Sequence, residues 1–187
     1  MLTEDNRTLL LQVARQSLQK GIETRNPLLV DALDYDDELR QKRATFVTLK
    51  SEQRLRGCIG LLEARRPLVE DVAYNAFAAG FRDSRFAPLE KIEIAELEIS
   101  ISVLQPSTAM QFENEADLIR QLVPGRDGLI LGYQQRRGTF LPAVWEDLRD
   151  PAKFLTHLKT KAGLAPDFWA DDLWVHRYTT ESFSDQG

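Results

Sequence analysis

The sequence of 187 residues is poor in the side chains that bind metals or form disulfides, with one cysteine and two histidines. One thiol cannot form a disulfide within the chain, whereas a secreted protein of this size usually has an even set of cysteines. One thiol and two separated histidines also offer no ligand spacing of the zinc type. The sequence therefore predicts a cytoplasmic protein with a reduced thiol at Cys58, no metal and no other cofactor.

Long apolar runs are missing as well. No run approaches the roughly 18 apolar residues that cross a bilayer, and residues 1–7 are charged where a signal peptide would be apolar. A basic excess is also lacking, because 24 Lys and Arg residues face 29 Asp and Glu residues, for a formal net charge of −5. These features predict no membrane association and argue against nucleic acid as a partner.

Three sequence motifs that would name a chemistry are absent. The chain contains no G-x-x-x-x-G-K-S/T, no G-x-G-x-x-G and no G-x-S-x-G. Phosphate-loop, dinucleotide-fold and serine-hydrolase functions therefore have no support in the sequence.

What the chain does have is the composition of a globular protein, with 43% hydrophobic and 28% charged residues. This composition is enough for one sizeable core, and we expect a single domain over residues 1–187. Helical patterns cover residues 4–20, 67–80, 116–123 and 151–162, and strand patterns cover residues 44–50, 54–62, 97–104, 128–133, 139–141 and 173–178. Strands joined by short turns, with helices between groups of strands, predict an α+β fold with an antiparallel sheet.

Two details of the helices can be tested directly. Gly21 is expected to end the first helix, because glycine is common just after a helix. In the helix over residues 67–80, Leu68 and Val72 belong to an apolar face, while Asp71 is expected to point away from it.

The strand over residues 54–62 combines glycines with residues that can carry chemistry. Strict alternation would place one set on the core face: Leu55, Gly57, Ile59 and Leu61. The opposite face would then hold Arg54, Arg56, Cys58 and Gly60. Gly60 is expected to leave room above the sheet, and a glycine within a strand often marks a bulge or the close approach of another group.

Cys58 is the first candidate for chemistry. Nearby positive charge lowers the pKa of a thiol and makes it a nucleophile, and Arg56 is expected on the same face. The alternative is that Cys58 is a small buried apolar side chain, as free cysteines commonly are. A nucleophilic cysteine also needs a base, and the spacing selects neither His157 nor His176 for this role.

The loop over residues 82–86 is the second candidate. Two arginines beside an aspartate can bind a carboxylate or phosphate through paired hydrogen bonds. The same residues can instead form a structural ion pair that holds the loop, with Phe86 as an apolar plug. The residues alone leave both alternatives open.

Several segments together resemble the AMMECR-one domain family. Leu55-Arg56-Gly57-Cys58-Ile59-Gly60 is similar to the six-residue signature of this family, and residues 83–89 are similar to its D-x-R-F-x-P-L loop. Further segments are similar to the family in the same order along the chain: residues 76–79, 97–104, Gly125 with Gly128-Leu129, 140–144 and 161–164. Ala143 stands where the family often has a polar residue.

The resemblance implies a compact α+β domain, in one or two lobes, with a groove near the signature strand. It also implies bacterial relatives that occur with Memo-type proteins and a radical SAM enzyme in a modification pathway. The resemblance implies that Arg56, Cys58, Asp83 and Arg85 are site residues, and the candidate site also includes Gly57, Gly60 and Phe86.

Two functional hypotheses follow. The first is a binding module that holds a small molecule or a Memo-type or radical SAM partner through Arg56, Arg85 and Phe86. The second is an enzyme, or a subunit of one, in which Cys58 is the nucleophile on an anionic substrate and Asp83 orients an arginine. A purely structural role of the signature is a third alternative, in which an arginine buried against Asp83 ties the strand to the loop.

Overall fold

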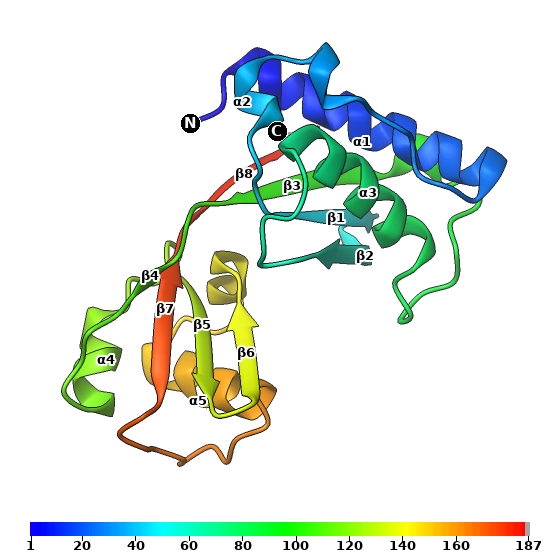
Figure 1. Ribbon diagram of the computed structural model, residues 1–187. Helices are drawn as coiled ribbons and strands as arrows, with labels where there is room; N and C mark the ends of the chain where they lie inside the picture. Colours follow the sequence, from blue (N-terminus) through cyan, green and yellow to red (C-terminus); the bar gives the residue numbers. More distant parts are fainter. Residues whose placement is uncertain (186–187) are drawn as a thin grey trace. The chain divides into compact units, whose positions relative to one another are not determined.

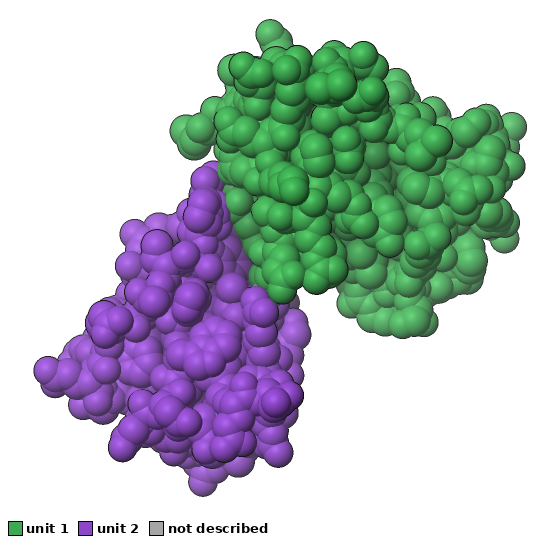
Figure 2. All heavy atoms as spheres, viewed as in Figure 1, with its two compact units in different colours: residues 1–104, 181–187 green, residues 105–180 purple. Residues whose placement is uncertain are grey.

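The computed structural model describes residues 1–185 of the chain, and residues 186 and 187, the last of the expected domain, lie outside this part. The chain divides into two compact units, which Figure 2 shows in different colours. Unit 1 consists of residues 1–104 together with residues 181–187, and unit 2 consists of residues 105–180. Unit 1 is therefore made from two separate stretches of the sequence.

Unit 1 is a four-stranded antiparallel sheet covered by helices (Figure 1). The strand order is β2 (Arg54–Gly60), β1 (Thr45–Ser51), β3 (Glu98–Leu104) and β8 (Thr180–Ser184). Helix α3 (Leu68–Phe81) packs on β1 and β2, and α1 (Glu4–Thr24) packs on α3 and β3. The shorter helices of the unit are α2 (Asp37–Arg40) and the 3-10 turns Ala32–Asp34 and Ile94–Glu96. The signature strand β2 therefore lies at one edge of the sheet.

Helix α1 begins where the sequence predicts and ends later. The side chain of Thr3 accepts a hydrogen bond from the backbone N–H of Asn6, which is the usual role of threonine before a helix. Gly21 does not end the helix, so this prediction is wrong. A Cβ atom at Gly21 would lie 2.9 Å from the ring of Phe77, so its lack of a side chain makes room for packing. The helix ends at Thr24, and Arg25 caps it with a left-handed φ of 57°.

Helix α3 buries the predicted apolar face, but Asp71 is buried as well, contrary to prediction. Its Oδ2 accepts hydrogen bonds from the backbone N (3.1 Å) and Oγ1 (2.7 Å) of Thr45, at the start of β1. Nδ2 of Asn75 donates to the same oxygen at 2.9 Å. Burial raises the pKa of Asp71, and the hydrogen bonds from Thr45 and the nearby charge of Arg66 offset part of that effect. Asp71 thus ties α3 to β1.

Unit 2 is a second four-stranded antiparallel sheet with its own core. The strand order is β4 (Thr108–Ala109), β7 (Trp174–Tyr178), β5 (Gly128–Tyr133) and β6 (Arg136–Phe140). Its helices are α4 (Glu115–Gln121), the 3-10 turn Pro142–Glu146 and α5 (Pro151–Lys161). In the core, the rings of Trp145 and Phe154 stack with centroids 3.7 Å apart.

The predicted fold class is confirmed, since the chain has an α+β fold with antiparallel sheets. The prediction missed β8, because the segment Thr180–Ser184 (TESFS) has a weak apolar pattern. Among residues 1–185, no helix is long and apolar enough to cross a membrane.

Candidate functional site

The signature strand β2 has an irregular register with its neighbour β1. Thr48 lies opposite Cys58 and Leu49 lies opposite Gly57, but the next residue of β1, Lys50, lies opposite Leu55. Arg56 is therefore the extra residue of a bulge, which breaks the strict alternation of faces. Leu55 is 42% exposed and does not join the core. The side chain of Arg56, in contrast, is only 16% exposed.

Leu61, beyond the end of β2, is 38% exposed, so the predicted core face fails at both Leu55 and Leu61. Gly57 is buried and Ile59 packs against the core of unit 1, as predicted.

The two glycines of the signature allow close packing. A Cβ atom at Gly57 would collide with the backbone oxygen of Ala79 and would lie 3.0 Å from the carbonyl carbon of that residue in α3. At Gly60, a Cβ atom would lie 2.5 Å from Cγ of Phe46 and would also collide with the carbonyl oxygen of Thr45. The space beside Gly60 is thus filled by Phe46, and the prediction of free room above the sheet at this point is wrong.

Cys58 is a free cysteine on β2 and is partly buried as a residue. The hydroxyl of Thr48 donates a hydrogen bond to the Cys58 Sγ at 3.2 Å. The backbone N–H of Cys58 points away from β1 and donates to Oδ2 of Asp83 at 2.9 Å. Both histidines belong to unit 2, so unit 1 supplies no imidazole base to this thiol.

Asp83 and Arg85 form a paired contact at the outer edge of β2. Nε of Arg85 donates to Oδ1 of Asp83 at 2.9 Å, and Nη2 donates to Oδ2 at 2.7 Å. The same Nη2 also lies 3.3 Å from the carbonyl oxygen of Cys58. The carboxylate of Asp83 thus accepts a hydrogen bond from the N–H of Cys58, and the guanidinium of Arg85 donates one to its C=O. A neighbouring strand would make the same two kinds of backbone hydrogen bond.

These contacts fix the charges of the pair. The hydrogen bonds from Arg85, joined by the N–H groups of Cys58 and Arg85, hold the pKa of Asp83 well below its usual range. The hydrogen bonds to Asp83 raise the pKa of Arg85 above its ordinary value. Asp83 is almost fully buried, while the Arg85 side chain is 55% exposed. The site therefore holds an ionised carboxylate inside and presents a guanidinium to solvent.

Phe86 completes this group, with its ring centroid 5.4 Å from Cζ of Arg85. Its backbone N–H donates to the carbonyl oxygen of Asp83 at 3.1 Å, which closes the turn after α3. The structure thus brings four of the candidate residues together: Cys58, Asp83, Arg85 and Phe86.

Arg56 pairs with a residue that sequence reasoning missed. Its Nε and Nη2 donate to the carboxylate of Glu93 at 2.7 and 3.1 Å. These bonds lower the pKa of Glu93, which also accepts the N–H of Glu90 at 2.7 Å. Nη1 of Arg56 is buried without a hydrogen-bond partner. Glu93 is one of 29 acidic residues, and no sequence pattern distinguishes it from the others. A buried arginine needs a carboxylate partner, but the sequence does not show which acidic residue will supply it.

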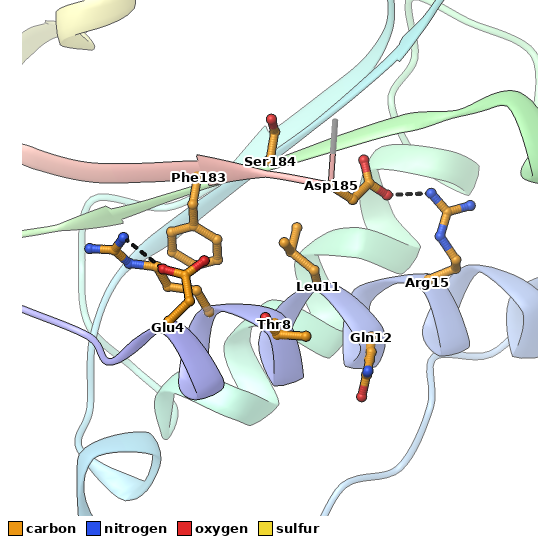
Figure 3. A pocket seen from close by; sticks show the side chains of 9 residues that line it. Glu4, Thr8, Leu11, Gln12, Arg15, Phe183, Ser184 and Asp185 are labelled. Carbon is orange, nitrogen blue, oxygen red and sulfur yellow. Dashed lines mark hydrogen bonds and ion pairs between the residues drawn. The ribbon is translucent and has the colours of Figure 1, made fainter. Parts of the chain in front are cut away.

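Two pockets lie along α1, and neither includes a residue of β2. One of about 340 Å³ is lined by residues of α1 and by the segment 183–185 (Figure 3). Leu11 and Phe183 lie in it, and the carboxylate of Asp185 contacts Arg15. The other, of about 520 Å³, lies between α1 and residues 91–95. In the described part of the chain, no group of three or more His, Cys, Asp or Glu side chains is placed to hold a metal ion.

Comparison with known proteins decides the family. The sequence model of the AMMECR1 family matches residues 11–183. The chain belongs to the AMMECR1 family. This confirms the resemblance that the signature strand and the D-x-R-F-x-P-L loop indicate.

Similar AMMECR1-family proteins come from archaea. A protein of Methanothermobacter thermautotrophicus is 34% identical, covering 100% of this chain and 97% of its own length. Protein MK0488 of Methanopyrus kandleri is 33% identical, covering 99% and 91%. A crystal structure of the uncharacterized protein PH0010 from Pyrococcus horikoshii has a TM-score of 0.86 at 32% identity, covering 95% of this chain and 90% of that one. The solved structure therefore has the same fold.

Proposed function

We propose that this AMMECR1-family protein is a binding module whose site is the Arg85 guanidinium with the Phe86 ring beside it. The site takes an anionic group of a small molecule or of a partner protein. The observation that carries the proposal is the geometry of Arg85, which is held by Asp83 on one side and is half exposed on the other. Its Nη1 is not engaged in the bonds to Asp83 and Cys58.

The guanidinium of Arg85 is already ordered before a ligand arrives, and this preorganisation favours binding. A free arginine side chain loses rotamer freedom when it is ordered, at a cost of about 1–2 kcal/mol. Here the paired contact with Asp83 has already ordered the side chain, so an incoming carboxylate or phosphate does not bear this cost. The negative charge of Asp83 partly cancels the positive charge of Arg85, so the attraction of Arg85 for an anion is weakened. We therefore expect the ligand to contact the ring of Phe86 as well.

The alternative is an enzyme that uses Cys58 as a nucleophile. A general base works best with a pKa near the operating pH, and the pKa of the neighbouring Asp83 is held far below that. Asp83 also bonds to the backbone of Cys58 and not to its sulfur. For these reasons binding is the better supported function.

The family resemblance suggests the partner and the setting. A Memo-type protein or a radical SAM enzyme of a modification pathway, in the cytoplasm, is the partner that we propose. Arg56 and Asp83 then act indirectly, since each is paired within the protein, and Gly57 and Gly60 act by close packing.

The test compares three variants in calorimetric titrations with a purified Memo-type protein from the same source. Arg85→Ala is expected to weaken binding at least about tenfold, or about 1.4 kcal/mol. Arg65→Ala removes an exposed arginine paired with Glu63 and serves as the matched control, with little change expected. Cys58→Ser is also expected to bind normally. Equal affinity of Arg85→Ala and wild type would contradict the proposal.

A second experiment addresses the enzyme alternative. The rate of Cys58 alkylation by iodoacetamide is measured against pH, on folded and on denatured protein. An apparent pKa well below the free-thiol value of about 8.5, with fast reaction of the folded protein, would favour catalysis or redox chemistry. Slow reaction of the folded protein is the result that the binding function predicts.

A further inference from the structure

Unit 2 has a sheet face on which aromatic rings lie flat against glycines. Trp174 lies opposite Gly132, and Tyr178 lies opposite Gly128. Three consecutive atoms of the indole, Cε2, Cζ2 and Cη2, would all lie within 2.7 Å of a Cβ atom at Gly132. Similar distances to three neighbouring ring atoms mean that the ring faces the strand instead of pointing at it with an edge. Because Gly132 has no side chain, the indole of Trp174 can pack with its face against the backbone of β5.

The two aromatic residues differ in exposure. Tyr178 is 2% exposed, and its hydroxyl donates to the carbonyl oxygen of Phe140 at 3.0 Å. Trp174 is 38% exposed. One face of the indole rests on the backbone of β5, so the exposed area belongs to the other face and to the ring edge. An open indole face on a rigid strand is a surface on which a planar ring can stack.

Two polar residues share this face of the sheet with the indole. Arg137 of β6 lies opposite Gly132, so its side chain leaves the sheet on the face that the indole covers, and it is exposed. His176 meets the indole edge-to-face at 5.4 Å. Nδ1 of His176 lies 3.4 Å from the hydroxyl of Ser107. The indole thus shares its sheet face with an exposed arginine and is in contact with an imidazole.

We infer that this face of unit 2, centred on Trp174, binds a nucleoside monophosphate, with the base stacked on the indole and the phosphate on Arg137. A planar ring matches the flat apolar surface, and one anionic group matches the one exposed arginine beside it. Aromatic stacking of this kind accepts any base, because every base has a flat face. The inference does not rest on the function proposed for Arg85, because no residue is shared between the two sites.

The charge around the site limits the ligand. Asp171 and Asp172 are exposed and lie within three residues of Trp174 in the sequence, and their charges disfavour additional negative charge on a ligand. We therefore expect a monophosphate to bind at least as tightly as a triphosphate, which would be unusual for a site that recognises phosphate alone.

The experiment is a titration of the full chain with adenosine monophosphate, followed by calorimetry, with adenosine and inorganic phosphate as separate probes. Trp174→Ala is expected to weaken both adenosine monophosphate and adenosine by about tenfold, since stacking on an aromatic ring contributes on that order. Arg137→Ala is expected to weaken the monophosphate but to leave adenosine within about twofold. Arg120→Ala, an exposed arginine paired with Asp117 on α4, is the control and should change neither.

Variant folding is checked by near-ultraviolet circular dichroism, and Trp174→Phe, which keeps a ring, should retain most of the affinity. Three outcomes would overturn the inference: no saturation of the wild type at millimolar adenosine monophosphate, equal affinity of Trp174→Ala and wild type, or Trp174-dependent binding of glucose in place of the nucleotide.

Discussion

At the scale of single residues, Asp83 connects the signature strand with the loop after α3. Its folded-state pKa is lowered by Arg85 and by backbone N–H groups. A carboxyl group with a lowered folded-state pKa adds stability that is complete above its unfolded pKa, about 3.9 for aspartate. This stability is lost as the pH falls from there through the folded-state value. Asp83 therefore stabilises the protein at neutral pH and not in strong acid.

We expect Asp83→Asn to lower the free energy of unfolding by about 1–3 kcal/mol at pH 7, because charge-assisted hydrogen bonds are lost in a buried place. The difference from wild type should shrink as the pH falls below about 4. Urea denaturation of both proteins between pH 7 and pH 3 measures this. Glu63→Gln, in an exposed ion pair, should cost less than about 1 kcal/mol at any pH. A gap that stays constant down to pH 3 would argue against the role of Asp83.

At the scale of elements, β2 is an edge strand that would offer unpaired N–H and C=O groups to another chain. Asp83 and Arg85 occupy these groups at Cys58. We expect the double variant Asp83→Ala/Arg85→Ala to self-associate at concentrations where wild type does not, as detected by light scattering. The double variant Arg56→Ala/Glu93→Ala removes a comparable ion pair without freeing the backbone of Cys58. Equal association of the two would show that loss of charge, and not the open edge, is the cause.

The limits of prediction also belong to the elements. The periods of 2 and 3.6 residues predicted four of the five α-helices and most strands, but not the short helix α2. Helix α5 begins at Pro151 as predicted, and the side chain of Asp150 accepts a hydrogen bond from the N–H of Lys153 at this end. The bulge at Arg56 could not be predicted, because it depends on the register with β1. Asp71 was misplaced for a related reason. Its partner Thr45 lies 26 residues away in the sequence, and spacing alone does not show which carboxylate will meet it.

At the scale of the whole molecule, composition and periodicity did not indicate two units, and the expectation of two lobes came from the family resemblance alone. Whether residues 1–187 act as a single domain stays a prediction. The candidate site shows the same pattern, because the sequence indicated the strand and the loop as candidates but did not identify Glu93. The two units and the Arg56–Glu93 pair depend on contacts between residues that are far apart in the sequence. Composition and periodicity carry no information about such contacts.

Unit 2 should fold without unit 1. It is one continuous stretch, its ends meet through the bond from Gln105 N–H to the Thr179 carbonyl at 2.9 Å, and its core is its own. The fragment 105–180 is expected to unfold cooperatively in urea with a slope of about 1 kcal/mol/M, and to keep the near-ultraviolet signal of stacked Trp145. A gradual loss of signal without a transition would contradict this expectation.

Strand β8 also has a consequence for the order of events during synthesis. Since β8 completes the first sheet, and Glu181 accepts hydrogen bonds from both Leu2 and Arg7, the first unit to be started on the ribosome is the last to be finished. Residues 105–179 of unit 2 are synthesised before β8, at about 5–20 residues per second. The nascent chain must therefore carry an incomplete three-stranded sheet, with the β3 edge open, for several seconds. A chaperone that covers exposed strand edges would act in this interval.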